Sequence, residues 1–215
     1  GPTPEALVAS ARRWIRQLEE WNFTDFKISL KSSSVLDTVA AYRLLAAEVD
    51  YPFHVGVTEA GGLYAGTVKS ALGIGLLLAE GIGDTIRVSL TRDPLEEVKV
   101  GYEILRALGL RQRGPEIISC PTCGRCQINL FQLAEEAERR LFPITTPIKV
   151  AIMGCEVNGP GEARQADLGI AGGKGFGILF RKGEIIRKIP ETELLKTLLV
   201  EVAALTGETP DLSGL

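Results

Sequence analysis

The first half of the chain alternates short apolar runs with amphipathic segments. Leu7, Ala11 and Leu18 recur at helical spacing between charged residues, and Thr3 and Pro4 suit an N-cap and a first helical position. Three strand–loop–helix units follow, with strands expected over residues 26–30, 53–57 and 85–90 and helices over 35–48, 67–80 and 95–108. Strands that alternate with helices in this way predict a parallel sheet.

Three parallel strands make an incomplete sheet, so the pattern suits the last part of a (β/α)₈ barrel, which needs about 250 residues in full. An open Rossmann-like sheet is the alternative. None of the three strands is followed by a Gly-rich dinucleotide loop, which favours the barrel.

The pattern changes after a basic, turn-rich stretch over residues 109–115. Strands are expected over 116–119, 148–153, 168–171, 177–180 and 185–189, with helices over 130–141 and 190–205. Arg181-Lys182-Gly183-Glu184 predicts a hairpin turn, and the Gly-rich run over 172–177 lies between strands, which favours a turn over a phosphate loop. We therefore predict two domains: the last strand–helix units of a TIM barrel over 1–112 and a small α+β domain over 113–215.

Composition limits the class of protein. The net charge of −3 gives no reason to expect nucleic acid or a membrane as partner, and no apolar run reaches the roughly 20 residues of a membrane span. No secretory signal is recognisable, so four cysteines indicate metal or catalytic chemistry before disulfides. The chain opens Gly1-Pro2 without methionine, which suggests a processed chain or a piece of a longer one.

Polar residues follow each expected strand of the first half. Lys31, Thr58 with Glu59, and Ser89 stand at or near the strand ends, where a barrel carries its chemistry. Polar loops are common at any surface, so this position alone is suggestive. His54 lies inside a strand, where a packed core histidine is the simpler interpretation.

All four cysteines lie between residues 120 and 155. Thiolates suit zinc or an iron–sulfur cluster, and a zinc site lacks its second Cys-x-x-Cys pair here. Cys120, Cys123 and Cys126 have ferredoxin-like spacing, and Cys155 completes four thiolates. A second arrangement replaces Cys126 with Glu162, whose oxygen is more easily displaced from iron. Spacing alone leaves both arrangements open.

Two motifs carry a resemblance to a known family. They are Ser119-Cys-Pro-Thr-Cys-Gly-Arg125 and Met153-Gly-Cys-Glu-Val-Asn-Gly-Pro-Gly-Glu-Ala163. Together with the runs over 27–33, 54–61, 84–90 and 167–173, they resemble the 4-hydroxy-3-methylbut-2-enyl diphosphate synthases of non-mevalonate isoprenoid synthesis. The resemblance covers nearly the whole chain.

The resemblance implies a barrel joined to an iron–sulfur domain like that of sulfite and nitrite reductases. It implies a [4Fe–4S] cluster held by Cys120, Cys123, Cys155 and Glu162, with Cys126 near the cluster but not bound to it. It assigns substrate binding or catalysis to side chains at the strand ends and beside Cys155. These are Lys31, Thr58, Arg87 and Ser89 for substrate binding, and Glu59 and Asn158 for catalysis.

The reaction implied is the reductive ring opening and dehydration of 2-C-methyl-D-erythritol 2,4-cyclodiphosphate to 4-hydroxy-3-methylbut-2-enyl diphosphate. Ferredoxin or flavodoxin is the implied electron donor. The resemblance also implies a homodimer, located in the bacterial cytoplasm or the plastid stroma. The family is longer at the N-terminus, so we expect weak or no activity from this chain alone. The rival hypotheses are a ferredoxin-like electron carrier with a four-cysteine cluster and a structural zinc domain.

Overall fold

A computed structural model describes residues 3–214. The outermost residues of the two expected domains lie outside the described residues; they are Gly1, Pro2 and Leu215. The chain divides into two compact units, residues 1–112 and 113–215. Each has a hydrophobic core of its own.

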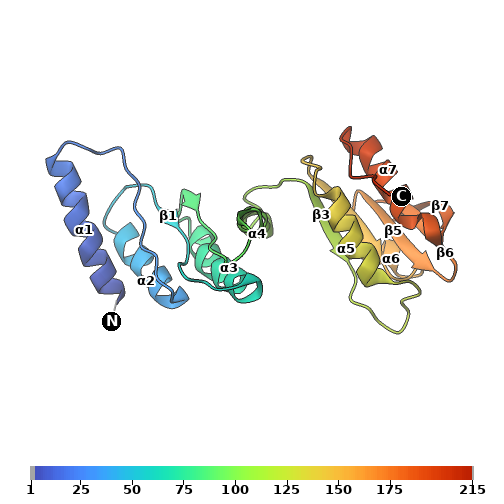
Figure 1. The fold of residues 1–215 in the computed structure, drawn as a ribbon, viewed down its shortest axis with the longest axis horizontal. Helices are drawn as coiled ribbons and strands as arrows, with labels where there is room; N and C mark the ends of the chain where they lie inside the picture. The colour runs from blue at the N-terminus through green and yellow to red at the C-terminus, as the bar shows by residue number, and fades with distance from the viewer. Residues whose placement is uncertain (1–2, 215) are drawn as a thin grey trace. The chain divides into compact units, whose positions relative to one another are not determined.

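The first unit contains four helices and a short parallel sheet within its described residues (Figure 1). Its elements are α1 (Pro4–Glu20), α2 (Val35–Ala46), β1 (His54–Val55), α3 (Leu63–Ala79), β2 (Thr85–Ile86) and α4 (Pro94–Ala107). β1 pairs in parallel with β2, and a parallel bridge joins Ile28 to Phe53. The predicted parallel order of three neighbouring strand segments is confirmed.

These strands are shorter than the apolar runs predicted. Val57 and Val88 are buried although they lie beyond the paired residues, because the helices still cover them. The hydrophobic pattern of the sequence indicates which residues are buried. A strand also requires backbone pairing, so the pattern overestimates strand length. Helix α3 begins at Leu63, earlier than predicted. Its N-cap residue is Gly62, which has no side chain to form a capping hydrogen bond, so the sequence shows no signal for this start.

Alternation along these strand segments separates two faces. Ile28, Leu30, Val55 and Val88 join the core formed with the helices. The side chains between them are partly or fully exposed on the opposite face, and Lys31, His54 and Arg87 are among them. In a TIM barrel this opposite face is the interior, which bulky apolar side chains usually fill. Here it is polar and cationic.

The second unit is a five-stranded mixed sheet with helices (Figure 1). Its elements are β3 (Pro115–Ser119), α5 (Leu130–Leu141), β4 (Ile148–Met153), α6 (Gly159–Glu162), β5 (Leu168–Gly173), β6 (Phe176–Arg181), β7 (Glu184–Pro190), the 3-10 turn η1 (Glu191–Glu193) and α7 (Leu194–Thr206). Strand order follows the sequence from β3 to β7, with parallel pairs up to β5 and antiparallel pairs after it.

The hairpin between β6 and β7 turns at Lys182 and Gly183, which have φ of 49° and 85°. Two positive φ values in a two-residue loop are the type I′ geometry that matches strand twist. This hairpin and the helix over 130–141 are confirmed. Of the helix expected from Pro190, the first turn is 3-10 and α7 starts at Leu194.

Candidate functional site: a cationic sheet face and a cysteine-bearing sheet edge

The sequence-predicted residues fall into two groups, one in each unit. In the first unit, Lys31 and Arg87 lie on the same face of the sheet, on strand segments to either side of Gly56. A β-carbon at Gly56 would lie 3.2 Å from Lys31 Cε and 2.3 Å from the Arg87 carbonyl oxygen. Gly56 therefore leaves room for the Lys31 side chain and for the close approach of the Arg87 backbone.

The electrostatics of this face show the crowding of positive charge. Partial burial, followed by the charges of Arg87 and Lys27, lowers the pKa of Lys31 to about 8. Within residues 3–214, no carboxylate forms an ion pair with Lys27, Lys31 or Arg87. Cations held together without an acidic partner favour an anionic ligand.

His54 and Lys27 are members of this face that the motif reasoning did not select. His54 is partly buried, and its Nδ1 lies 2.7 Å from Thr85 Oγ1, so it is not the packed core histidine expected. Burial first, and then the charges of Lys31, Lys27 and Arg87, lower the pKa of His54. The strict alternation of polar and apolar residues along 27–31 was the signal that could have found Lys27.

Tyr42 fixes the backbone beneath these side chains. Its buried hydroxyl donates to the His54 carbonyl at 2.6 Å and accepts from the Leu30 N–H at 2.9 Å. Ser29 also donates to the His54 carbonyl, and the Lys31 ammonium donates to Ser29. This network ties the segment that carries Lys31 to β1.

The remaining predicted residues of this unit lie at the strand ends. The Thr58 N–H donates to the Ser32 carbonyl at 3.1 Å, which joins two post-strand loops. Glu59 is exposed and has a φ of 51°, a strained conformation for a residue with a side chain, and such strain concentrates at functional sites. The Ser89 hydroxyl is buried without a hydrogen-bond partner among the described residues. This leaves it available to hydrogen-bond a bound ligand.

In the second unit, two predicted ligands follow neighbouring parallel strands. Cys120 comes directly after β3, and Cys155 comes two residues after β4. Because Ser119 pairs with Ile152, both cysteines lie at the same edge of the sheet. The Gly154 N–H donates to Cys120 Sγ at 3.3 Å, so the two strand ends are in direct contact.

Glu162 stands on the short helix α6, which packs against β4 and β5. A β-carbon at Gly159 would lie 2.8 Å from Ala171 Cβ and 2.9 Å from Met153 Cβ, so only glycine lets α6 pack this closely on β4 and β5. Asn158 Nδ2 lies 3.4 Å from Glu162 Oε1, a long hydrogen bond. Asn158 is thus a partner of the predicted carboxylate ligand.

Cys123 and Cys126 lie in the loop that follows Cys120. Cys123 is exposed, whereas Cys126 is partly buried against the core and its thiol donates to the Ile128 carbonyl at 3.3 Å. Among residues 3–214, no three His, Cys, Asp or Glu side chains converge as they would on a single metal ion. A four-iron cluster takes its ligands one to each iron, so its ligand set is spread around the cluster rather than gathered at a point.

The donor set of the second unit fits the chemistry of an iron–sulfur cluster. Cys120, Cys123 and Cys155 are soft ligands, Glu162 is an exposed carboxylate, and the N–H donor on Cys120 Sγ is the kind of hydrogen bond that cluster thiolates accept. A hollow of about 440 Å³ adjoins Cys120, Pro121 and Phe131.

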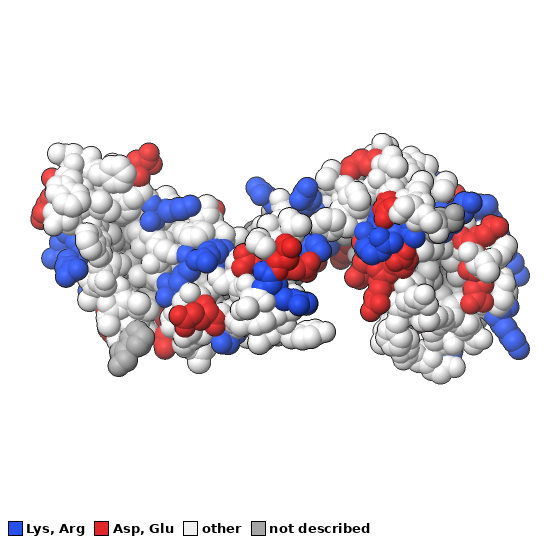
Figure 2. Space-filling model, viewed as in Figure 1, with Lys and Arg blue, Asp and Glu red and all other residues white. Residues whose placement is uncertain are grey.

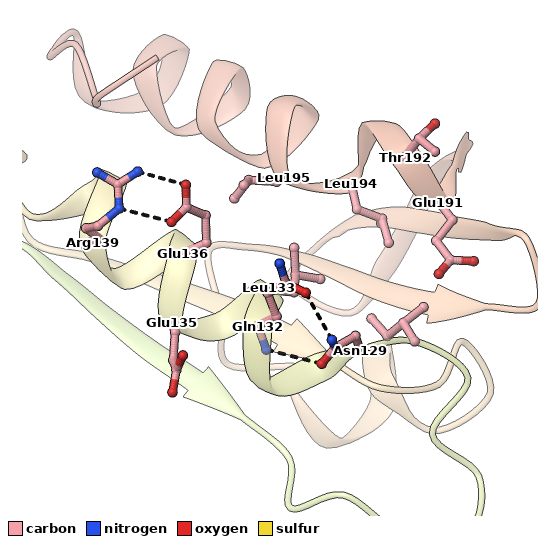
Figure 3. A pocket seen from close by; sticks show the side chains of 11 residues that line it. Asn129, Gln132, Leu133, Glu135, Glu136, Arg139, Glu191, Thr192, Leu194 and Leu195 are labelled. Atoms are coloured by element: carbon pink, nitrogen blue, oxygen red, sulfur yellow. Dashed lines mark hydrogen bonds and ion pairs between the residues drawn. The ribbon is translucent and has the colours of Figure 1, made fainter. Parts of the chain in front are cut away.

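A second pocket of about 800 Å³ lies between α5 and the start of α7 (Figure 3). Its side chains partner one another: Glu136 is paired with Arg139, and Asn129 with Gln132. None of the sequence-predicted residues lines it. We therefore place the candidate chemistry at the cysteine-bearing edge and not in this pocket.

Comparison with known families accounts for both units. Residues 1–102 match the model of the GcpE TIM-barrel domain, and residues 116–204 match that of the GcpE protein C-terminal domain. The chain belongs to the GcpE family. The first unit is accordingly part of a TIM-barrel domain, as predicted, and the second is the family's C-terminal domain.

Two relatives from different bacteria share one name. The chain is 61% identical over 207 residues to "4-hydroxy-3-methylbut-2-en-1-yl diphosphate synthase (flavodoxin)" of Geobacter sulfurreducens, a match that covers 96% of this chain and 59% of the relative. It is 66% identical over 189 residues to the protein of the same name from Nitratidesulfovibrio vulgaris, with 88% and 49% covered. The chain thus spans about half the length of the curated relatives it matches. The family resemblance seen in the cysteine motifs is confirmed.

Two further observations bear on the class of protein. None of the helices within residues 3–214 is both long and apolar enough to cross a lipid bilayer. On the face drawn in Figure 2, basic and acidic side chains are interspersed over each unit, in keeping with the net charge of −3.

Proposed function

We propose that this chain carries the cluster domain and part of the substrate-binding barrel of a 4-hydroxy-3-methylbut-2-enyl diphosphate synthase. The observation that carries the proposal is the 61% identity to a relative of that name across 96% of the chain, which includes both candidate sites. The proposed substrate is 2-C-methyl-D-erythritol 2,4-cyclodiphosphate. Its conversion takes up two electrons and two protons, breaks the ring C–O bond and releases one water.

The cationic sheet face supports the binding of a diphosphate. Lys31 and Arg87 would hold phosphate oxygens, and the unpartnered Ser89 hydroxyl would donate a further hydrogen bond. A phosphate placed among these cations relieves their mutual repulsion, which favours the charged form of Lys31. Thr58 and Glu59 follow the strand segment that lies between those of Lys31 and Arg87. There Glu59 would position a substrate hydroxyl or move a proton.

The sheet edge of the second unit supports a [4Fe–4S] cluster held by Cys120, Cys123, Cys155 and Glu162. When bound, such a cluster supplies single electrons and a Lewis-acidic iron. Glu162 is the one oxygen donor of the set, and a carboxylate would be a weaker ligand for iron than a thiolate. Asn158, whose Nδ2 lies 3.4 Å from Glu162 Oε1, would orient this carboxylate and would donate a hydrogen bond to a substrate oxygen.

The partners proposed follow the names of the relatives. Flavodoxin is the proposed electron donor, because the names of the relatives contain it. A homodimer and a bacterial cytoplasmic location belong to the same proposal.

Anaerobic reconstitution of the chain with iron and sulfide tests the cluster proposal. We expect about four iron atoms per chain, as a [4Fe–4S] cluster requires, and paramagnetic resonance of a reduced [4Fe–4S] centre. We expect the signal to change in Glu162→Ala and iron to be lost in Cys155→Ser, with Cys126→Ser as the control that keeps the cluster. Stoichiometric zinc without iron would favour a structural metal domain. Loss of iron from Cys126→Ser but not from Glu162→Ala would favour a four-cysteine electron carrier.

A further inference from the structure

The thiols of Cys120 and Cys126 have opposite hydrogen-bonding roles. Cys120 Sγ accepts a hydrogen bond from the Gly154 N–H, whereas Cys126 Sγ donates one to the Ile128 carbonyl. The Ile128 carbonyl is a backbone partner for Cys126 within its own loop. Cys126 is therefore arranged as a structural group beside the proposed ligands.

The Gly154 peptide is held from both sides. Its N–H points at Cys120 Sγ, and its carbonyl accepts from the Gln127 N–H at 2.9 Å. The side chain of Cys126 lies directly against this glycine, since a β-carbon there would be 2.7 Å from Cys126 Sγ and 3.3 Å from Cys126 Cβ. Cys126 and its neighbour thus fill the space in which the peptide could otherwise rotate.

The turn that carries Cys126 is itself anchored. The Cys126 N–H donates to the Cys123 carbonyl at 3.0 Å. Two residues on, the side chain of Ile128 packs on β5, where a β-carbon at Gly172 would lie 2.5 Å from Ile128 Cγ2. The Cys126 thiol is hydrogen-bonded to the Ile128 carbonyl. Cys126 therefore connects Ile128, which packs on β5, to the Gly154 peptide.

We propose that Cys126 is a positioning residue that fixes the Gly154 N–H on the sulfur of Cys120 and so raises the reduction potential of the bound cluster. The inference rests on the proposed cluster site. Hydrogen bonds to ligand sulfurs stabilise the more negative, reduced cluster, and they are among the factors that set its potential. A loosened Gly154 peptide would weaken this bond and shift the potential to more negative values.

Reductive titration of the reconstituted full chain, followed by paramagnetic resonance, tests the role of Cys126. Cys126→Ala removes the packing against Gly154, and we expect it to keep its iron but to show a more negative potential than the parent chain. Cys126→Ser retains a donor for the Ile128 carbonyl, so we expect a potential close to that of the parent. Thr122→Ala, an exposed change in the same loop, serves as the matched control and should leave the potential unchanged.

A size exchange gives a second, independent measurement. Gly154→Ala alone would place a methyl group against Cys126 Sγ, and we expect a more negative potential or partial loss of iron. Adding Cys126→Ala removes the closest contact, so the double variant should recover part of the iron and of the potential.

Three outcomes would overturn the inference. Loss of iron from both Cys126→Ser and Cys126→Ala would make Cys126 a ligand. Full iron with an unchanged potential in Cys126→Ala would remove its positioning role. Failure of the parent chain itself to bind iron would overturn the proposed cluster site and this inference together, and it is recognised before any variant is made.

Discussion

Lys31 is the residue whose chemistry is most altered by its surroundings. Partial burial, with Arg87 and Lys27 as like-charged neighbours, brings its pKa down to about 8. The Lys31 ammonium is therefore mostly charged at neutral pH and loses its charge in mildly alkaline solution. An anion bound beside it depends on that charge.

This predicts a pH dependence of anion binding. The affinity of the chain for inorganic pyrophosphate should fall by about tenfold or more as the pH rises through the Lys31 pKa of about 8, because a charge-assisted hydrogen bond is lost. Isothermal titration calorimetry across this range measures it. Lys31→Gln should remove the part of the pH dependence that belongs to the protein.

The neighbours of Lys31 provide the control. Arg87→Gln removes a like charge, so the midpoint of the remaining pH dependence should move to higher pH while overall affinity falls. Lys69→Gln removes the same charge from α3, on the other side of the strands, and should leave the midpoint in place. Equal midpoint shifts in the two variants would contradict the proposed origin of the low Lys31 pKa.

At the scale of elements, the absence of a side chain at Gly159 determines where helix α6 lies on the sheet. This helix has only four residues, and contact with β4 and β5 rather than helix propensity must hold it. Gly159 provides that contact because its place has no room for a β-carbon. The position of Glu162 follows from this packing.

Two glycines of α6 form a matched pair for a test. Gly159→Ala should destabilise the second unit by about 1–3 kcal/mol through overpacking and should reduce iron retention, because α6 is displaced with Glu162. Gly161→Ala should do neither, since a β-carbon at that position meets no atom within 4 Å. Urea denaturation and iron analysis of both variants measure the difference. Equal stability of the two would contradict this account of α6.

At the scale of the whole molecule, apolar burial is divided between separate cores. The cluster around Leu77 draws only on residues before 112, and those around Leu198 and Phe180 draw only on residues after 113. The basic, turn-rich stretch over 109–115 contains the boundary between the two units.

Separate cores predict local effects of core truncation. Leu77→Ala and Leu198→Ala both remove fully buried side chains, and each should destabilise its own unit by about 2–5 kcal/mol. Hydrogen exchange followed by mass spectrometry should show faster exchange mainly within residues 3–112 for the first variant and within 113–214 for the second. Equal loss of protection in both units after either change would contradict the division of the core.

Much of this molecule follows from sequence. The order of the longer helices and of the sheet strands, the parallel pairing in the first half and the hairpin at Lys182-Gly183 were predictable, because periodicity and turn chemistry are local properties of the chain. The four-residue helix α6 was not predicted. The cysteine spacing and the Met153–Ala163 motif were enough to indicate the family. Strand lengths and the start of α3 were not predictable, since backbone pairing and an uncapped helix start leave no clear signal in the residues.

Only the tertiary structure decided how these residues act on one another. Spacing left Cys126 and Glu162 both open as the fourth ligand, and the family resemblance favoured Glu162. The structure adds the neighbours of Cys126, which are a carbonyl that its thiol donates to and a glycine that it packs against. It also placed Lys27 and His54 beside Lys31, where their charge and burial change proton affinities. The sequence thus determined which chemical groups are present and in what order. Their hydrogen-bond partners and mutual repulsion depend on distances through space, which folding alone sets.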